Sequence, residues 1–308
     1  MSKNNLTAWS TNAQWVFDST EPFTAADEGK WLRIDPAVNW TPGYQVVRFV
    51  LEGFDLGAQG VQNIAFLYDT LTAGGIASGK ASFVTNQTNR LVADGNSFLQ
   101  YPNPGGDTNN YQRREWMKRT QYLLGPTWEV INLGVSGQTT AQMLSDESSQ
   151  VLPLYDATKA RNVLFAFEGI NDLFYGASVA TAYANLKAYG QAGVGAGFET
   201  WLCTGTPRQE TGTPADYASK LAALNAMLRA DFGAATNLPL VKGRSAGVTY
   251  AHRLVDVGAL PEFADPTSAF YFEPDKVHLN LSGFDRAATL LAPVASSIVV
   301  PAPAFVNL

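Results

Sequence analysis

Residues 91–99 read LVADGNSFL, an apolar run followed at once by a tight turn. Short apolar runs of this kind are typical of strands that are buried on both faces of a sheet. The Asp-Gly pair is a turn signal, and Ser97 stands just after it. Residues 128–137 and 163–172 have the same form, because in each an apolar run enters a glycine-containing turn that carries a polar side chain. Such turns can aim backbone N–H groups and an Asn amide at one point, as a developing oxyanion requires.

From residue 89 onward, strand-like runs alternate with helical patterns. In residues 217–232 the apolar side chains lie three or four positions apart, and Thr213-Pro214 with Asp216 predicts the start of this helix. Another helical pattern runs through residues 179–186. The alternation predicts a parallel sheet with helices on both faces. Ligand sites of such sheets lie at the carboxyl ends of the strands, where the three turns described above also fall.

Residues 1–87 differ from the rest of the chain. They hold short β-type runs at 44–51, 63–68 and 80–84, separated by Gly, Pro, Asp and Thr, and no stretch has helical periodicity. Runs of this length and composition are typical of strands. We therefore predict a β-rich N-terminal accessory domain over residues 1–87 and an α/β domain over residues 88–308.

Four of the seven tryptophans lie in the first forty residues, namely Trp9, Trp15, Trp31 and Trp40. Exposed rings of this kind can stack on sugars, but tryptophans of a small β-domain are more often part of its core, which is the interpretation we favour. Three roles are open for the region: a carbohydrate-binding module, an assembly domain, or a lid over a site in the α/β domain.

His278 is one of only two histidines in the chain and follows Asp275 by three positions. A neutral imidazole can take a proton from a weak nucleophile near pH 7, and a carboxylate can hold its tautomer. Residues 282–285 read SGFD, a capping pattern that predicts a C-terminal helix directly after this loop. The alternative is that Asp275 and His278 form a surface pair that only fills a turn.

Four segments together resemble the four sequence blocks of the SGNH (GDSL-type) hydrolase and esterase family, over about residues 88–298. They are Gly95-Asn96-Ser97, Asn132-Leu133-Gly134, Gly169-Ile170-Asn171-Asp172 and Asp275-Lys276-Val277-His278. The resemblance implies a three-layer α/β/α, flavodoxin-like sandwich around a central parallel sheet. It further implies that Ser97 is the nucleophile, His278 the general base and Asp275 the residue that orients it. The backbone N–H groups of Ser97 and Gly134 and the Asn171 amide would form the oxyanion hole, with no metal and no organic cofactor.

The chain departs from the family pattern beside the nucleophile. Asn96 stands where Asp is usual, and Phe98 stands where Leu is usual. Asn keeps the size of Asp and one acceptor but loses the charge, so we expect the turn to survive with altered hydrogen bonding. Because Ser97 and its three expected partner residues are all present, we predict a divergent but active member.

A rival nucleophile is Ser245, in the Gly-x-Ser-x-Gly pattern of residues 243–247. In an α/β-hydrolase this elbow lies between a strand and a helix, and Asp256 or Asp265 with His278 would complete the chain order. Residues 248–257, however, are rich in β-branched side chains and favour a strand. With 27 glycines in the chain, chance matches to such a pattern are common. His252 is then expected to be structural or exposed.

Composition limits the remaining classes. With 308 residues, 46% of them hydrophobic, the chain can bury a large core. A net charge of −6 without a Lys/Arg run argues against nucleic acid or an anionic membrane as partner. The single cysteine, Cys203, excludes an internal disulfide and is expected in a buried strand, and the two histidines argue against a structural zinc site. No apolar window is long enough for a membrane span, and the first residues hold no apolar segment of the kind found in signal peptides, so we expect no signal peptide in this chain. We expect a soluble protein, cytoplasmic or secreted or virion-associated by another route, whose oligomeric state is undetermined.

The loop after Cys203 should border the same edge of the sheet, and its Arg208 is expected to lie in solvent rather than on a polar substrate. The function predicted from all of this is a serine esterase that hydrolyses small acyl esters, acetyl or short-chain, with carbohydrate esters as the first substrate to consider. The second hypothesis is a non-catalytic carbohydrate-binding or virion structural protein whose hydrolase fold has decayed.

Overall fold

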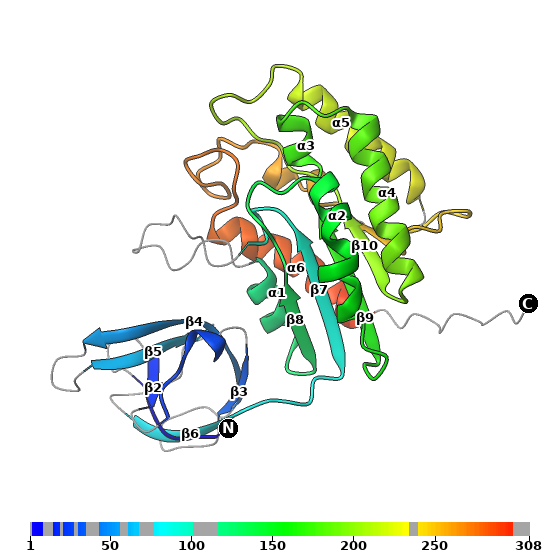
Figure 1. Ribbon diagram of the computed structural model, residues 1–308. Coiled ribbons are helices and arrows are strands. Elements are labelled where there is room, and N and C mark those ends of the chain that lie inside the picture. Colours follow the sequence, from blue (N-terminus) through cyan, green and yellow to red (C-terminus); the bar gives the residue numbers. More distant parts are fainter. Residues whose placement is uncertain are drawn as a thin grey trace, which may run out of the picture.

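The computed structural model describes residues 2–8, 15–18, 21–27, 30–34, 43–55, 61–67, 77–100, 116–233 and 240–297. The described strands form two separate sheets (Figure 1). The first is a closed barrel within residues 2–83, and the second is an open sheet whose first strand begins at Asn89. The expectation of strands in the N-terminal region and of alternating strands and helices after it is confirmed for the described residues.

The barrel closes through antiparallel pairs in the order β1-β2-β5-β4-β3-β6. Closure leaves no unpaired strand edge, which removes a template for aggregation. Its strands are β1 (Ser2–Ala8), β2 (Trp15–Asp18), β3 (Trp31–Ile34), β4 (Gly43–Asp55), β5 (Val61–Leu67) and β6 (Ala77–Phe83), with a short 3-10 turn at Ala25–Asp27.

The second sheet has six strands in the order β11-β12-β10-β9-β7-β8. All neighbours are parallel except β11, which runs antiparallel to β12 at one edge. The five parallel strands follow the doubly wound flavodoxin-like order, as predicted. The strands are β7 (Asn89–Gly95), β8 (Trp128–Asn132), β9 (Arg161–Phe167), β10 (Glu199–Cys203), β11 (Val241–Gly243) and β12 (Arg253–Val255).

Helices cover both faces of this sheet and complete three layers (Figure 1). One face carries α1 (Trp116–Leu124) and α6 (Leu281–Ser297), which pack on each other. The other carries α2 (Thr140–Gln150), α3 (Ile170–Phe174), α4 (Val179–Gly195) and α5 (Tyr217–Asp231). Because both faces are covered, the central strands are mostly apolar and buried; every residue of β10 is buried, Cys203 among them. No helix within the described ranges has the length and apolar character that a bilayer span requires.

Two helix starts differ from the sequence prediction. α5 begins at Tyr217 with Asp216 before it, so Thr213 does not cap the helix. α6 begins at Leu281, and the Gly283 N–H donates to the Asn280 side chain at 3.1 Å, so Asn280 rather than Ser282 satisfies its first turn. Both errors arise because several residues with capping side chains stand close together, and tertiary packing selects one of them.

The order β8-β7-β9 places a topological switch point at the carboxyl end of β7. Chain order moves from β7 to β8 on one side and then to β9 on the other, so α1 and α2 leave the sheet on opposite faces (Figure 1). Ligands of open α/β sheets bind in the crevice that such a reversal creates. Gly95 ends β7 opposite Phe167 at the end of β9. The turns after β7, β8 and β9 therefore meet at one place.

The barrel contacts the α/β part through Trp31. This side chain is buried, donates from Nε1 to the Trp128 carbonyl at 3.2 Å and stacks on Tyr122 of α1 with ring centroids 6.3 Å apart. The expectation of a core role is confirmed for Trp31. The side chain of Trp15 and all of Trp9 and Trp40 lie outside the described residues.

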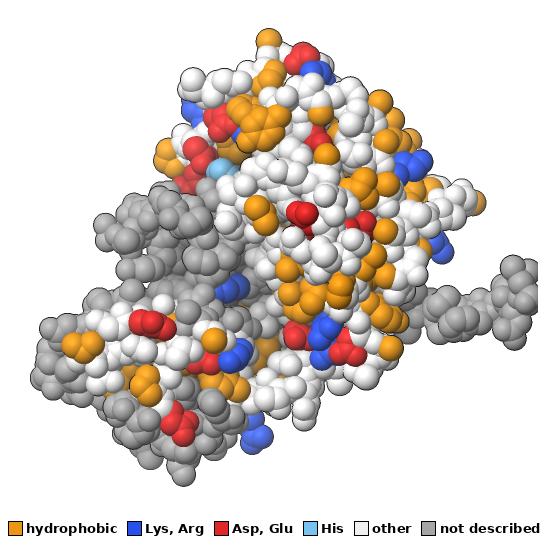
Figure 2. All heavy atoms as spheres, viewed as in Figure 1, with side chains coloured by type: hydrophobic (Ala, Val, Ile, Leu, Met, Phe, Trp, Pro, Cys, Tyr) orange, Lys and Arg blue, Asp and Glu red, His pale blue; other side chains and the backbone are white. Residues whose placement is uncertain are grey.

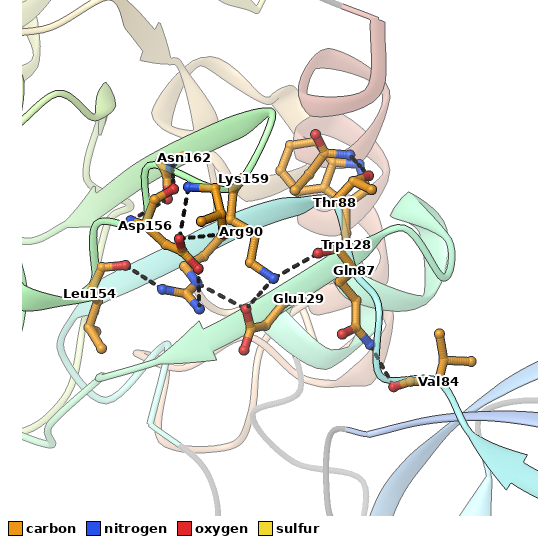
Figure 3. A network of polar contacts seen from close by, with 12 residues as sticks. Val84, Gln87, Thr88, Arg90, Trp128, Glu129, Leu154, Asp156, Lys159 and Asn162 are labelled. Atoms are coloured by element: carbon orange, nitrogen blue, oxygen red, sulfur yellow. Dashed lines mark hydrogen bonds and ion pairs between the residues drawn. The ribbon is translucent and has the colours of Figure 1, made fainter.

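A network of polar contacts secures the segment that joins the two parts (Figure 3). Lys159 donates to the Gln87 carbonyl at 2.7 Å and pairs with Glu129 at 3.3 Å. Arg90 of β7 pairs with Glu129 at 2.9 Å and donates to the Leu154 carbonyl at 2.6 Å. These contacts lie at the amino ends of the strands, away from the switch point. On the face shown in Figure 2, Lys and Arg side chains are scattered rather than gathered in one patch.

Two buried carboxyl groups lie between β7 and the helices that cover it. Asp94 accepts a hydrogen bond from Tyr189 of α4 at 2.8 Å, and burial raises its pKa to about 6 despite that bond. Burial, with the charge of Asp94, raises the pKa of Glu147 of α2 to about 8. Because both groups bind protons more tightly in the folded than in the unfolded chain, their protonation stabilises the fold in acid, and that stability is lost as pH rises from about 4 to about 8.

Glu147→Gln is expected to flatten this dependence, since the amide stays neutral at every pH. Between pH 5 and pH 9 the free energy of unfolding should fall by about 2 kcal/mol less in the variant than in the wild type. Urea denaturation at a series of pH values measures this. Asp216→Asn, which removes an exposed carboxylate just before α5, is the control. Equal slopes for wild type and Glu147→Gln would show that the pair does not titrate as inferred.

Candidate active site

Ser97, His278 and Asp275 lie in one hydrogen-bonded line. The Ser97 Oγ is 2.7 Å from Nε2 of His278, and Nδ1 of the same ring is 2.6 Å from Oδ2 of Asp275. Ser97 follows β7, whereas the other two residues belong to the loop that leads into α6. The structure thus brings together the three side chains that the sequence proposed, across 181 positions of chain. An arrangement of nucleophile, base and orienting carboxylate is the geometry of a serine hydrolase.

The local backbone fixes the carboxylate as well as the imidazole. Oδ1 of Asp275 accepts the N–H groups of Val277 at 2.9 Å and His278 at 3.0 Å, which leaves Oδ2 for the ring. Burial by itself would raise the pKa of Asp275, but these hydrogen bonds and the one from the ring outweigh it and lower the pKa to about 2. The carboxylate is therefore ionised near neutral pH, and in that form it can stabilise a positive charge on the neighbouring ring.

Asp275→Asn is expected to lower kcat/KM by about tenfold to a hundredfold, because an amide can present N–H to Nδ1 and favour the wrong tautomer. The loss is limited because the Asp275 side chain is 44% exposed, so that water can replace part of its role. Hydrolysis of p-nitrophenyl acetate measures it. Asp285→Asn is the matched control, since that side chain is 47% exposed and pairs with Arg119. Equal losses in the two variants would remove Asp275 from the site.

Close packing shapes the nucleophile turn. A Cβ on Gly95 would collide with the carbonyl oxygen of Phe167, so only glycine lets β7 and β9 approach here. Phe98 is buried, and its ring lies 5.0 Å from that of Phe167 and 5.4 Å from that of His278. The Phe98 that replaces the usual Leu therefore supports the imidazole directly.

Asn96 occupies a buried position beside an unusual carboxyl group. Its Oδ1 accepts the Phe98 N–H at 3.0 Å, so the turn survives the exchange of Asp for Asn as expected. Burial raises the pKa of Glu168 well above its ordinary range, while N–H groups of Gly169 and Asn171 and the Asn96 side chain act against the rise. An Asp at position 96 would add a further buried carboxyl group near Glu168, whose pKa the buried Asp172 already raises. The neutral amide of Asn96 thus suits the residue at 168, and the departure from the family pattern has a local physical reason.

The turn after β8 is tied to the nucleophile turn by Asn132. Its Nδ2 donates to the Leu99 carbonyl, and its Oδ1 accepts the Gly134 N–H at 3.1 Å. A Cβ on Gly134 would lie 2.6 Å from the Gln100 backbone nitrogen. Glycine is thus required here by the close approach of two turns. The Gly134 N–H already has an acceptor within the protein, so its place in the oxyanion hole stays a prediction. The N–H of Ser97 makes no hydrogen bond with any residue that the structure describes.

Asn171 lies in the first turn of α3 and is buried. Its Nδ2 donates to the Gln138 carbonyl at 2.8 Å, which uses one of its two hydrogens. Its backbone N–H donates to Glu168 at 3.2 Å. Asp172 next to it accepts the backbone N–H of Thr140 at 2.8 Å and the Thr140 hydroxyl at 2.5 Å, which fastens α3 to the start of α2. The Asn171 amide is therefore held from both sides at the carboxyl end of β9.

Comparison with solved structures agrees with this architecture. A member of the lipolytic protein G-D-S-L family from Veillonella parvula aligns over 68% of this chain and 100% of its own, with a TM-score of 0.51 and 16% sequence identity. The chain has the fold of the GDSL-type, or SGNH, hydrolases.

Two other similar structures are named as esterases. The psychrotrophic esterase EstA from Pseudoalteromonas sp. aligns over 67% of this chain and 95% of its own, with a TM-score of 0.47 and 17% identity. Est24, a carbohydrate acetylesterase from Sinorhizobium meliloti, aligns over 68% and 100%, with a TM-score of 0.46 and 14% identity. No protein-family model and no curated protein sequence matches the chain.

Arg208 lies at this site and not in solvent, so the expectation of a solvated loop arginine is wrong. Its side chain is 7% exposed and pairs with Glu210, and its Nη1 is 3.3 Å from Oδ1 of Asn171. The loop that carries Arg208 is also joined to the loop that carries His278, because the Gln209 N–H donates to the Lys276 carbonyl at 3.0 Å. Lys276 has a φ of 59°, a left-handed conformation that non-glycine residues rarely adopt and that often marks functional loops.

A cavity of about 650 Å³ adjoins the same loop. It lies between the loop, α5 and residues 258–266, and its lining includes Arg208, Glu210, Tyr217 and Asn225. Among the described residues, Ser97 and His278 are not part of the lining, so the cavity lies beside the candidate nucleophile rather than around it. The described residues hold no group of three or more His, Cys, Asp or Glu side chains that could bind a metal ion.

The rival elbow around Ser245 is not formed. β11 precedes it, but residues 244–252 form turns and bends in place of a helix. Because β11 is antiparallel, its end pairs with Arg253 at the start of β12, at the amino edge of the parallel strands. Ser245 therefore lies at the opposite edge from Ser97, and its Oγ accepts the Gly233 N–H at 3.0 Å. The predicted strand over residues 248–257 shrinks to Arg253–Val255.

His252 lies at that same far edge. Its ring Nδ1 accepts the Thr200 backbone N–H at 3.1 Å, and the backbone N–H of His252 donates to the Thr200 carbonyl at 2.7 Å. Burial lowers the pKa of His252, and the nearby Arg244 adds to this effect. A neutral ring that accepts a backbone hydrogen bond fits the structural role that the sequence favoured.

Proposed function

We propose that this protein is a serine esterase that hydrolyses small acyl esters, acetyl or short-chain, through an acyl-enzyme. The observation that carries the proposal is the line of hydrogen bonds from Ser97 through His278 to Asp275 at 2.7 and 2.6 Å. It lies at the switch point of a fold shared with lipolytic hydrolases.

In the proposed reaction His278 Nε2 takes the proton of Ser97 as its oxygen attacks the ester carbonyl. The tetrahedral oxyanion is stabilised by the Ser97 N–H and by the second hydrogen of the Asn171 amide. Gly134 can contribute its N–H only by sharing it with Asn132. The imidazolium then returns the proton to the departing alcohol, and water, activated by the same ring, releases the acid. Asp275 stays ionised throughout.

Among substrates, simple short-chain esters come first for testing and carbohydrate esters second. Part of the case for sugar came from tryptophans in the N-terminal region, and the buried Trp31 does not offer a stacking surface. Residues 1–87 are proposed as an accessory domain. No feature of the described residues favours the alternative of a non-catalytic binding or virion protein over an esterase.

A fluorophosphonate probe tests the proposal, since it phosphonylates activated serines without any knowledge of the natural ester. We expect one adduct, on Ser97, located by mass spectrometry, together with p-nitrophenyl acetate hydrolysis that Ser97→Ala abolishes. Labelling of another serine, or hydrolysis that survives Ser97→Ala, would overturn the assignment of the nucleophile. Absence of both labelling and hydrolysis would support the non-catalytic alternative.

A further inference from the structure

Arg208 makes an unusual set of contacts for a loop arginine. Its guanidinium lies over the Phe174 ring, 4.0 Å from the ring centre, with Tyr217 on another side at 5.9 Å. Glu210 neutralises its charge, and Nη1 reaches Oδ1 of Asn171. Burying an arginine is unfavourable unless its charge and its donors are matched. A hydrophobic side chain could fill the same space. The presence of an arginine therefore points to its contact with the Asn171 amide.

The contact determines how the Asn171 amide is oriented. A guanidinium can only donate, so the amide atom that faces Arg208 is the oxygen; a backbone carbonyl can only accept, so the atom that faces Gln138 is the nitrogen. Both ends of the amide are thereby assigned without ambiguity. With Nδ2 fixed by one hydrogen, the direction of its second hydrogen is fixed as well.

A cation on the amide oxygen also changes the donor strength of the nitrogen. Hydrogen bonds in a chain polarise one another, because electron density drawn towards the oxygen leaves the N–H groups more positive. A donor that is preorganised and polarised before the reaction stabilises the oxyanion more than one that must reorganise during it.

We infer that Arg208 is a positioning residue for the oxyanion hole, which acts on the reaction by fixing and polarising the Asn171 amide. The inference rests on the proposed function. It differs from a substrate-binding role, because the Arg208 side chain, although it borders the neighbouring cavity, is only 7% exposed and already contacts Glu210 and Asn171.

A double-mutant cycle with Asn171 tests the inference. Arg208→Met keeps an unbranched apolar stem but removes the guanidinium, and with it both the charge and the donors. With p-nitrophenyl acetate we expect kcat to fall about tenfold and KM to change less than about threefold, and the rate at which fluorophosphonate labels Ser97 to fall with kcat. In the Asn171→Ala background the same substitution should change kcat less than about threefold, since the group on which Arg208 acts is gone.

Arg208→Lys keeps the charge for Glu210 but not the fork that also reaches Asn171, so it should lower kcat about threefold to tenfold while it melts like the wild type. If Arg208→Met does not fold, the kcat of Arg208→Lys tests the positioning role in its place. Arg161→Met is the matched control, because Arg161 is also poorly exposed, pairs with a glutamate and lies over the Trp128 ring, but at the amino edge of the sheet. We expect its kcat to be unchanged.

Four results would each overturn the inference. The losses from Arg208→Met and Asn171→Ala could prove additive, or Arg208→Met could raise KM and leave kcat unchanged. A folded Arg208→Lys could keep wild-type activity, or Arg161→Met could lower kcat as much as Arg208→Met does. Failure of the proposed function looks different, because the wild type itself would then not be labelled on Ser97.

Discussion

His278→Ala is expected to lower kcat/KM by on the order of a thousandfold or more. The 2.7 Å contact with Ser97 is the only route by which the hydroxyl can lose its proton to a side chain among the described residues. Without the imidazole, Ser97 must attack as a neutral alcohol, and the leaving group departs without a general acid. The fold should survive, because the His278 side chain packs on Phe98 from one side and its neighbours Val277 and Leu279 supply the buried contacts of the loop.

Comparison of three variants checks this expectation. His252→Ala removes the other histidine of the chain, at the far edge of the sheet, and should leave kcat/KM within about threefold. Ser97→Ala combined with His278→Ala should be hardly worse than either change alone, since nucleophile and base act as one unit. Multiplying losses in the double variant, or a larger loss from His252→Ala, would show that the base is elsewhere.

The dependence of kcat/KM on pH provides a second test of the pairing between His278 and Asp275. Because hydrogen bonds outweigh burial and hold the pKa of Asp275 at about 2, this carboxylate stays ionised at every pH near neutrality. As pH falls, kcat/KM should therefore decline along a single ionisation, that of the imidazole, which cannot accept a proton once it is charged. A second ionisation between about pH 3 and pH 6 would mean that Asp275 is not held as the geometry implies.

The parts of this fold that could be predicted are those that depend on neighbours in the chain. β7 ends where the Asp-Gly signal places it, and α5 shows the spacing of its buried Leu221, Leu224 and Leu228. Three of the four blocks could be placed at one edge of the sheet because parallel strands present their carboxyl ends together. Closure of the barrel could not be predicted, because each of its pairs depends on a strand elsewhere in the sequence.

The error at the site has the same origin. Nothing around Arg208 in the sequence indicates Phe174 or Asn171, so the sequence alone places this loop arginine in solvent. The place of the Gly134 N–H in the oxyanion hole is implied by the resemblance and stays a prediction; its acceptor in the structure, Asn132, stands two positions earlier, a spacing typical of an Asx turn. Asn96 shows why a single departure from a motif is hard to interpret from sequence. In the sequence it suggests a hydrolase that has lost its activity, whereas in the structure it lies beside the buried carboxyl group of Glu168.

Asn171→Ala is expected to lower kcat about a hundredfold to a thousandfold with little change in KM, the usual result of removing one preorganised oxyanion donor. The ground-state ester places no full charge near this amide, so loss of the amide should change the affinity for substrate little. The tetrahedral intermediate carries a negative charge there, so its stability should fall. The variant should fold, because α3 is also held by the hydrogen bonds between Asp172 and Thr140.

Asn225→Ala is the matched control for Asn171→Ala. Asn225 is equally buried and bonds Gly205 through both ends of its amide, at 3.0 and 2.9 Å, but it lies under the loop after β10. Its loss should lower the melting temperature and leave kcat within about threefold, the reverse of the pattern for Asn171. If Asn171→Ala kept wild-type kcat with a normal melting curve, the amide would not be a donor. The oxyanion would then depend on the N–H of Ser97, with Gly134 released from Asn132, and the effect ascribed to Arg208 would have no group through which to act.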